Sequence, residues 1–598
     1  MRNEKYNKII TELEALPIGG ITYKRINEKE YAYYQWRENG KQRSRRIKDE
    51  EIEVLLPQIE RRKELQQLIK DAGVPYKSKR NDKKYRCMIR TGEELERFIQ
   101  PVINWKKREC YQHLYNYIYD DSYDRVYILY GLRRTGKTTL IRQLISEMEP
   151  SMKDKTAFIQ IQDKKTLDDV NHDLKRLEKQ GYRYVFIDEV TLLDDFIEGA
   201  ALFSDIFAAS GMKIVLSGTD SLGFMFTKDE ELYDRCIMSH TTFIPYREFE
   251  DVLGIVGIDE YIRYGGTMSL GGKKYNDYAM TFSSKRSTDE YVDSAIARNI
   301  QHSLKNYQYE GHFRSLLELY EKNELTNVIN RIVEDMNHRF TVEVLTRDFT
   351  SNDLRISAGN LRKDREQPTD ILDKIDISQV NETLKHLLEI KDKADQMVDI
   401  QDAHRFEIKE YLDLLDLTVD IENRSMSDYN KKDFRTVFSQ PGLRYSQAEA
   451  LIESLMQDDK FRDLSWEERN RVTRRIMDEI KGRMMEDIIL LETKMSKSSC
   501  EVFRLQFAVG EFDMVVYNPQ EGLCEIYEIK HSKEVVPQQC RHLLDEKKCK
   551  DTEFRYGKII GKYVIYRGES ASLQHTGYDV VEDIQYLNVE EYLKGLIL

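Results

Sequence analysis

The chain has 598 residues, of which 40% are hydrophobic and 33% are charged. This length predicts roughly three to five domains rather than one core, and no apolar stretch approaches the ~20 residues that a membrane helix requires. The first residues, MRNEKYNKII, lack the apolar run of a signal peptide, and the seven cysteines are scattered without a C-x-x-C pair. We therefore expect a globular, cytoplasmic protein with no membrane partner, no disulfide framework and no zinc site.

The formal net charge of −13 is unevenly distributed along the chain. Residues 1–110 hold 27 Lys and Arg against 18 Asp and Glu, a net charge of +9, and the remainder holds 66 against 88, a net charge of −22. A basic arm on an acidic body indicates a polyanionic partner for the arm. A solvated basic surface without a partner is an equally open alternative.

The basic arm contains a predicted three-stranded sheet. Residues 21–26 and 29–39 alternate as strands do, Asn39-Gly40 is a hairpin turn signal, and KQRSRRIK follows as a third strand. With helical spacing over 49–70, we expect a small basic sheet-and-helix domain over 1–70 and a linker over 71–109. Aromatic residues interleave with cations here, which suits nucleic acid but equally suits a small sheet that buries one face. These residues are Tyr31, Tyr33, Tyr34, Trp36, Arg37, Lys41, Arg43, Arg45 and Arg46.

Strand-like and helix-like segments alternate over residues 110–255. This alternation predicts a parallel α/β sheet covered by helices. Five strands are expected, at VYILY (126–130), TAFIQIQD (156–163), YRYVFIDEV (182–190), KIVLSGTDS (213–221) and TTFIPY (241–246).

A phosphate-binding loop follows the first of these strands. Gly131-x-x-x-x-Gly136-Lys137-Thr138 lies between a strand and a helix-forming run, which is the context that a P-loop requires. Lys137 is expected to reach the β- and γ-phosphates, and the Thr138 hydroxyl to ligate Mg²⁺. A chance glycine-rich turn is the alternative. The residues assigned to nucleotide binding are Gly131, Arg134, Thr135, Gly136, Lys137, Thr138 and Thr139.

An acidic pair ends the third strand, about fifty residues after the loop. Asp188 is expected to hold Mg²⁺ through its water shell, and Glu189 to orient or polarise the attacking water. Ser217 and Thr219, at the tip of the next strand, are candidate sensors of the γ-phosphate. The alternative is a helix cap on Thr219, Asp220 or Ser221. ATP is expected rather than GTP, since the NKKD tetrapeptide at 430–433 lies far outside the α/β core.

Two arginines are candidates for charge stabilisation during phosphoryl transfer. Arg235, just before the fifth expected strand, is a candidate transition-state arginine in cis or from a neighbouring subunit. Arg298 is a second candidate that would approach from the following helical region, a predicted lid over 256–340. Residues 341–425 then predict a winged helix, from short helices at 349–360, 377–390 and 406–425 that end in a β wing.

The C-terminal residues 426–598 carry a second constellation. Asp513 lies in one predicted strand, and Glu528-Ile529-Lys530 ends the next, which is the D…ExK pattern of a PD-(D/E)XK nuclease core. Asp513 and Glu528, with Glu486 from the preceding helix, could bind Mg²⁺ or Mn²⁺, and Lys530 could orient the water. Gln538 or Gln539 could brace the site from a helix over 536–549. A module that only holds DNA or protein is the alternative.

Several motifs together resemble one family, the AAA+-type ATPases of the AAA_14/DUF4143 group with a C-terminal PD-(D/E)XK-like domain. The motifs that carry this resemblance are GLRRTGKTT (131–139), VFIDEV (185–190), VLSGTDS (215–221), FIPYREF (243–249), YIRYGGTMS (261–269), YLDLLDL (411–417) and SQPGLRY (439–445), followed by the EFDMVV and YEIKHS strands. The resemblance covers about residues 110–565 and implies ATP binding at 131–139 with Asp188, a winged-helix middle and a nuclease-like end.

The predicted fold class is therefore a multidomain α/β protein with a P-loop core of the AAA+ (ASCE) type. It adds a small N-terminal β-sheet and helix, a helical lid with a winged helix, and a PD-(D/E)XK-like domain. The predicted function is an ATPase coupled to a metal-dependent nuclease that acts on DNA as a homo-oligomer. The alternative is a regulatory ATPase switch that binds DNA or a protein partner without cleaving.

Overall fold

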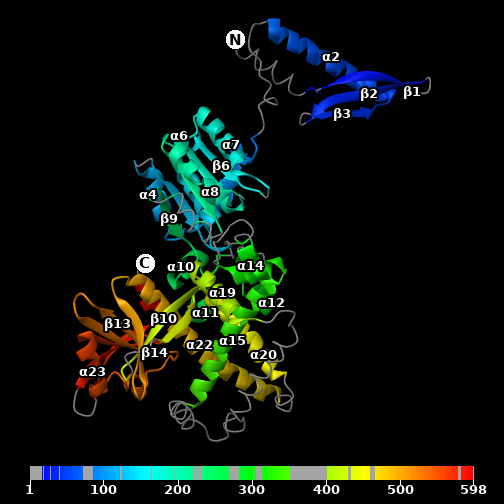
Figure 1. Ribbon diagram of the computed structural model, residues 1–598. Helices are drawn as coiled ribbons and strands as arrows, with labels where there is room; N and C mark the ends of the chain where they lie inside the picture. Colours follow the sequence, from blue (N-terminus) through cyan, green and yellow to red (C-terminus); the bar gives the residue numbers. More distant parts are fainter. Residues whose placement is uncertain are drawn as a thin grey trace. The chain divides into compact units, whose positions relative to one another are not determined.

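The structure of the chain is a computed structural model, and Figure 1 labels its helices and strands as in the text below. The residues whose structure it describes are 16–17, 19–26, 29–38, 41–71, 85–121, 124–162, 164–193, 195–219, 224, 232, 234–268, 282–298, 300–301, 304, 313–322, 324–350, 400–427, 433–457, 465–576 and 581–596. The chain divides into two compact units, Met1–Tyr85 and Arg86–Leu598. No helix among these residues is both long enough and apolar enough to cross a membrane.

The first unit is the predicted sheet and helix. Its strands are β1 (Gly20–Ile26), β2 (Lys29–Glu38) and β3 (Lys41–Arg46), antiparallel in the order β1-β2-β3, and α2 (Asp49–Asp71) follows. Ala32 and Ile47 on the sheet side and Ile59 and Leu65 on the helix are buried, so they form the small core.

The second unit opens with a six-stranded sheet in the order β4-β6-β7-β8-β5-β9. All neighbours are parallel except β4 and β6. The central strands are continuous apolar runs, as strands covered on both faces must be. The strands are β4 (Met88–Arg90), β5 (Val126–Tyr130), β6 (Thr156–Gln160), β7 (Tyr184–Asp188), β8 (Lys213–Gly218) and β9 (Cys236–His240).

Two predictions about this sheet are wrong. The last strand is β9 at 236–240 rather than 241–246, because the latter residues turn toward the loop after β5. Residues 88–102, assigned to a linker, form β4, α3 (Gly92–Ile99) and the 3₁₀ turn η1 (Gln100–Val102), and β4 pairs with β6. A strand of three residues carries too little alternation to be recognised in a sequence.

Short helices connect and cover the strands of this sheet. Helices α3 to α5 share one hydrophobic core with β5, β6, β7 and β8. Besides α3, the helices and helical turns of this region are α4 (Tyr111–Tyr119), α5 (Lys137–Glu147), α6 (Pro150–Lys153), α7 (Leu167–Lys179), the 3₁₀ turn η2 (Val190–Leu192), α8 (Phe196–Gly199) and the π-helix η3 (Phe203–Ala208).

A helical region follows, as the sequence predicts. Its helices are α10 (Tyr246–Leu253), α11 (Ile258–Tyr264), α12 (Lys285–Tyr291), the π-helix η5 (Val292–Ala297), α14 (Arg314–Glu321), α15 (Leu325–Thr350), α19 (Asp402–Leu414) and α20 (Pro441–Met456). The helix expected at 377–390, most of that at 349–360 and three residues of the NKKD tetrapeptide lie outside the described residues.

The C-terminal half is built on an eight-stranded sheet in the order β11-β10-β12-β13-β14-β15-β17-β16. Its strands are β10 (Thr418–Ser425), β11 (Asp433–Phe438), β12 (Glu501–Gln506), β13 (Glu511–Asn518), β14 (Leu523–Lys530), β15 (Lys558–Tyr566), β16 (Ala571–Thr576) and β17 (Val581–Asn588). Its helices are α22 (Trp466–Ser496), the 3₁₀ turn η6 (Pro537–Cys540), α23 (Glu546–Tyr556) and α24 (Val589–Gly595).

Two further predictions need correction in this half. The segment 406–425, expected as a helix that ends in a β wing, forms the end of α19 and then β10, which pairs with β11 and β12 inside the large sheet. The helix expected over 536–549 is instead η6, a turn and then α23, which starts at Glu546. Helix α22 followed by β12, β13, β14, α23 and β15 nevertheless gives the order αβββαβ, with β14 and β15 parallel.

The helical region and the C-terminal sheet share one hydrophobic core. It includes Tyr246 and Phe249 of α10 and Tyr261 of α11, together with Ile489 of α22 and Ile529 of β14. Because these residues share one core, a domain boundary at 255/256 does not separate independent cores.

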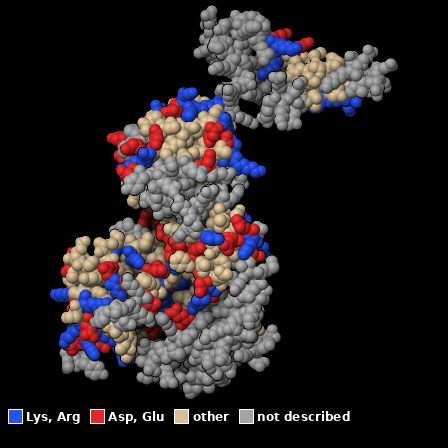
Figure 2. All heavy atoms as spheres, in the orientation of Figure 1, with Lys and Arg blue, Asp and Glu red and all other residues tan. Residues whose placement is uncertain are grey.

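Acidic and basic side chains are interspersed over the face of this unit that Figure 2 shows.

Candidate nucleotide site and carboxylate pair

The loop after β5 needs glycine at two positions. Gly131 and Gly136 have φ of +139° and +96°, where other residues are strained. A Cβ on Gly131 would lie 2.6 Å from Thr241 Oγ1 and 3.0 Å from the Thr242 amide nitrogen. The backbone can therefore curl closely only with these residues, and α5 begins directly afterwards at Lys137.

Lys137 is buried in the loop. Its Nζ donates to the carbonyls of Gly131 and Leu132, at 2.7 Å each. Burial lowers the pKa of Lys137 to about 8, although Glu189 and Asp188 act in the opposite direction. The ammonium group thus lies between two backbone oxygens and an acidic pair. A bound anion of higher charge could replace the two carbonyls as its hydrogen-bond partner.

Asp188 is the centre of a short hydrogen-bond network. Thr138 Oγ1 donates to Asp188 Oδ2 at 2.8 Å, and the Ser217 hydroxyl donates to Asp188 Oδ1. The structure therefore brings together the hydroxyl and carboxylate that the sequence assigns to Mg²⁺. Hydroxyl and carboxylate oxygens are the kind of ligand atom that Mg²⁺ prefers.

Glu189 follows in a left-handed conformation, with φ of 56°. Burial and the neighbouring Asp188 raise the pKa of Glu189, while a hydrogen bond from Thr219 lowers it. Its Oε2 is buried and makes no hydrogen bond among the described residues. A buried carboxylate oxygen without a donor fits a site whose remaining donor, such as water or a metal ligand, arrives with the nucleotide.

A buried ion pair behind the loop escaped the sequence analysis. Arg108 Nη2 lies 2.7 Å from Glu248 Oε2, and both side chains are almost completely buried. The same guanidinium donates to the carbonyls of Thr135, Thr241 and Phe243 at 2.8–2.9 Å. Arg108 therefore ties the loop to α10, and its partners lie too far away in sequence for a local pattern to reveal them.

The other assigned residues are distributed around the loop. The Thr135 hydroxyl is buried and donates to Leu132 O at 2.8 Å, so it braces the loop from within. Arg134 has φ of 63° and its guanidinium lies 5.9 Å from the Tyr291 ring centre. Thr139 is partly buried in the first turn of α5. The exposed Arg298 lies 3.9 Å from Asp293 and makes a weak surface pair.

The assignment of Arg235 to the nucleotide of its own chain is wrong. Its carbonyl accepts from the Val126 amide, at the start of β5, whereas the loop follows the other end of that strand. Its side chain is half-exposed and pairs with Asp205 at 2.7 Å. The local sequence could not reveal this, because the sheet edge on which Arg235 lies depends on the true position of β9.

The second constellation joins two neighbouring strands. Met514 pairs with Tyr527, so Asp513 and Glu528 are adjacent across β13 and β14. Lys530 Nζ lies 3.0 Å from Asp513 Oδ2 and 2.7 Å from Glu528 Oε2. The Ile529 amide donates to Asp513 Oδ2 at 2.8 Å. Asp513, Glu528 and Lys530 thus form a compact group, as predicted from the period-two spacing.

The pKa values of the two carboxylates are shifted in opposite directions. Burial alone would raise the pKa of Asp513, but Lys530 and the Ile529 amide outweigh it and lower that pKa to about 2. Burial and the negative Asp513 raise the pKa of Glu528 well above its ordinary value. Glu528 Oε1 is buried without a hydrogen-bond partner in the described part of the chain. This orphaned oxygen fits a site that exchanges a proton for a cation.

Glu486 lies beside this pair, but arginines hold its carboxylate. Arg483 Nη1 donates to Glu486 Oε2 at 2.5 Å, and Arg435 and Arg504 each approach the same oxygen to 4.0 Å. No group of three or more His, Cys, Asp or Glu residues with a metal-binding arrangement occurs among the described residues. The predicted three-carboxylate set is therefore incomplete, because arginines hold the third carboxylate.

Neither glutamine braces the carboxylates. Gln539 Nε2 donates to Ser532 Oγ at 2.7 Å and to Glu534 O at 3.0 Å, so it stabilises the loop after β14. Gln538 is exposed.

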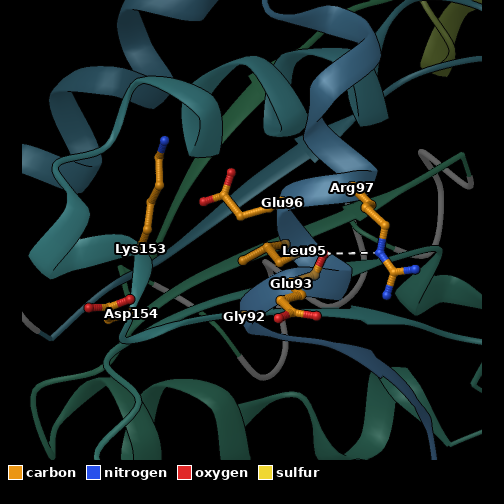
Figure 3. A pocket seen from close by; sticks show the side chains of 7 residues that line it. All are labelled: Gly92, Glu93, Leu95, Glu96, Arg97, Lys153 and Asp154. Carbon is orange, nitrogen blue, oxygen red and sulfur yellow. Dashed lines mark hydrogen bonds between the residues drawn. The ribbon is translucent and has the colours of Figure 1, made fainter.

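A shallow pocket of about 500 Å³ lies elsewhere on the second unit, lined by residues of α3 with Lys153 and Asp154 (Figure 3). Lys153 and Asp154 lie just before the N-terminal end of β6, whereas the P-loop follows the C-terminal end of β5. Strands β5 and β6 run in the same direction in this sheet. The pocket is therefore at the opposite sheet edge from Lys137. Its lining mixes acidic and basic side chains, and Arg97 donates to the Glu93 carbonyl at 3.3 Å.

Comparisons with known proteins cover part of this picture. Residues 123–250 match the family model of an AAA domain, and residues 3–61 match a domain of unknown function (DUF6788). No curated protein matches. The Aeropyrum pernix ORC1 protein, solved in complex with DNA, is similar over 62% of this chain and 97% of that chain, at 11% identity. Its TM-score of 0.22 is too low to carry an argument.

The AAA match spans the P-loop, Asp188 and Glu189. The chain therefore contains an AAA-type P-loop domain within a mixed α/β multidomain protein, as the resemblance to AAA_14 implies. The match does not extend to the C-terminal half of the chain.

Proposed function

We propose that the protein binds and hydrolyses ATP with Mg²⁺ at the loop after β5. The observation that carries this proposal is the network of Thr138, Asp188 and Ser217 beside Glu189, whose Oε2 lacks a partner among the described residues. Lys137 and the loop amides would bind the phosphates, and Thr138 with Asp188 would hold Mg²⁺. Mg²⁺ supplies charge neutralisation for the phosphoryl group. Glu189 would orient the attacking water and accept its proton.

Two substitutions test the ATPase. Lys137→Ala is expected to abolish nucleotide binding, because it removes the cation inside the loop. Glu189→Gln is expected to keep ATP binding and to slow turnover by about 10²-fold or more, because the amide cannot accept the proton. Binding is measured by fluorescent-nucleotide titration and turnover by phosphate release. Lys179→Ala, an exposed lysine in α7, is the control. Equal turnover by wild type and Lys137→Ala would refute the assignment.

We further propose that the C-terminal half cleaves DNA with Mg²⁺ or Mn²⁺, under control of the ATPase, in a homo-oligomer. This rests on the αβββαβ order and on Asp513, Glu528 and Lys530 at its centre. The two carboxylates would hold the metal, which would supply Lewis-acid polarisation of the phosphate. Lys530 would lose its bridging position and stabilise developing negative charge.

Cleavage is tested on plasmid and on single-stranded DNA, in Mg²⁺ or Mn²⁺, with and without ATP. Glu528→Ala and Lys530→Met are expected to abolish cutting, and Lys137→Ala to change its dependence on ATP. Glu525→Gln is the matched control, because Glu525 lies on the same strand at odd spacing from Glu528 and therefore on the other face. Light scattering with and without ATP reports the oligomeric state. Cutting that survives Glu528→Ala would contradict this site.

One observation favours the second function, a switch that holds DNA or a protein without cleaving. Three arginines surround Glu486, and Lys530 occupies the space between Asp513 and Glu528. In this arrangement the cationic side chains already outnumber the carboxylates without a metal ion. Intact DNA in all conditions, together with normal ATP turnover and ATP-dependent DNA binding, would establish this function instead.

A further inference from the structure

The two faces of the N-terminal sheet differ in what covers them. Cross-strand pairing aligns Tyr23 with Ala32, and the Ile47 amide donates to Ala32 O at 3.0 Å, so these three share one face. Ala32 and Ile47 are buried, and Arg45 on the same face pairs with Glu51 of α2 at 2.8 Å. Helix α2 therefore covers this face.

The opposite face carries aromatic and polar side chains. Register pairs Thr22 with Tyr33 and Tyr33 with Arg46, and Tyr31 lies two residues before Tyr33 on β2. We call the set Thr22, Tyr31, Tyr33, Gln35, Ser44 and Arg46 the tyrosine face. Thr22, Ser44 and Arg46 are exposed, and both tyrosines are partly exposed. The sequence left open whether the aromatics bury a face, and Tyr31 and Tyr33 lie on the face away from α2.

An arginine is already stacked on this face. The Arg46 guanidinium lies 3.8 Å from the centre of the Tyr31 ring. It thereby stands over one of two tyrosines whose side chains project about 7 Å apart along the strand. Rings at this spacing on a flat sheet are platforms on which successive unpaired bases can stack, with a cation available for the phosphate between them.

The charge of the unit agrees with a polyanionic ligand. Residues 20–46 hold eight Lys and Arg against three Asp and Glu, and residues 1–85 hold 21 against 14, a net charge of +7. The rest of the chain then has a net charge of −20. The side of this unit that Figure 2 shows carries both basic and acidic atoms beside uncharged surface. An acidic protein would also match the charge, and the two ring faces at a spacing that suits successive bases favour nucleic acid over it.

We propose that the tyrosine face binds single-stranded nucleic acid, with one base stacked on Tyr33 and another on Tyr31 in place of the Arg46 guanidinium, which would move to pair with a phosphate. Duplex would be bound more weakly, because its bases are already stacked and a sheet face cannot enter between them. The residues of this site are different from those of the proposed ATPase and nuclease sites. The site would therefore let the chain bind nucleic acid without nucleotide or metal.

The test uses the full chain in EDTA without ATP, so that neither turnover nor cutting contributes. Fluorescence anisotropy measures the affinity for a labelled 20-nucleotide single strand of DNA or RNA and for the matched duplex. Tyr31→Ala and Tyr33→Ala are each expected to weaken single-strand binding about tenfold, and Tyr33→Phe to leave it unchanged. Arg46→Gln is expected to weaken binding and to flatten its salt dependence by about one phosphate contact.

Tyr23→Ala is the matched control, since Tyr23 is an exposed tyrosine of the same sheet on the α2 side. Circular dichroism verifies that each variant folds, and photocrosslinking of a 5-bromouracil strand followed by peptide mapping reports the contact directly. Crosslinks in β2 together with loss in the two alanine variants would support the proposal. Equal affinity of wild type and variants, equal loss in Tyr23→Ala, or equal binding of duplex and single strand would overturn it, whatever the outcome of the ATPase and nuclease assays.

Discussion

Arg108 is the residue on which the geometry of the P-loop depends. Its guanidinium makes hydrogen bonds to three backbone carbonyls and to Glu248, and all of these contacts are buried except the partly buried one to Phe243. A buried cation with so many acceptors holds its neighbours in fixed positions, whereas its own burial is unfavourable without the carboxylate. The loop is thus preorganised from behind, by a residue that would not contact nucleotide.

Removing the charge of Glu248 should therefore destabilise the P-loop and make it open more often. Glu248→Gln leaves the Arg108 charge buried without a counterion, which typically costs about 3–5 kcal/mol. Hydrogen exchange should show faster opening of the loop and α10, and ATP affinity should fall. Asp251→Asn in the same helix is the control, since Asp251 and Lys106 form an exposed pair with side-chain exposures of 64% and 62%. Exchange rates that do not differ between the two variants would refute the role of the pair.

At the scale of elements, α22 connects the two halves of the second unit. Near one end Glu492 accepts the Tyr246 amide of α10 at 2.7 Å, and two turns earlier Glu486 lies beside the carboxylate pair. Burial raises the pKa of Glu492 to about 8, although the Tyr246 amide and Arg247 lower it. We therefore expect the contact between α22 and α10 to depend on pH.

The sign of this sensitivity follows from proton uptake. Between pH 4.5, the ordinary pKa, and about 8, folded Glu492 binds a proton that the unfolded chain does not. Its stabilising contribution is thus complete below pH 4.5 and is lost as pH rises to about 8. Glu492→Gln should remove up to ~1.4 kcal/mol per pH unit from the slope of stability against pH. Urea denaturation between pH 5 and 8 measures it, with the exposed Glu467→Gln of α22 as control. An unchanged slope would contradict the raised pKa.

The elements also show what a sequence can and cannot reveal. Strands β5 and β7 are predicted because buried strands are continuous apolar runs, and β14 is predicted from its strand-like alternation. β9 was misplaced because its residues, CIMSH, are only partly buried, while the following TTFIPY has stronger strand propensity. β10 was assigned to a wing because its pairing with β12 spans more than 75 residues, and no local pattern encodes such a partner.

The candidate sites follow the same rule. Thr138 with Asp188 and Asp513 with Glu528 and Lys530 meet as predicted, because each set sits at the ends of adjacent strands with recognisable motifs. The arginines around Glu486 and the partners of Arg108 were not foreseen, since they arise from packing between distant segments.

At the scale of the whole molecule, the two units should differ in how they tolerate truncation. A chain that starts at Arg86 keeps all elements of the six- and eight-stranded sheets, so we expect it to fold and to retain ATP turnover. A chain that ends at 255 would expose Tyr246 and Phe249, which belong to the core shared with α22, so we expect it to aggregate. Size-exclusion chromatography and phosphate release distinguish the two. A soluble, active 86–255 fragment would disprove the shared core.

Helix α24 gives this shared core a consequence for biosynthesis. Glu590 of α24 accepts the Ile258 amide of α11 at 3.0 Å, and Lys594 pairs with Glu250 of α10 at 2.6 Å. The surface beside the P-loop domain is thus completed by residues that the ribosome makes more than 300 positions later. At the usual ~5–20 residues per second, that surface stays uncovered for tens of seconds during translation. Binding of a chaperone to the nascent chain during this interval, and its release once α24 has emerged, would be the expected course of folding in the cell.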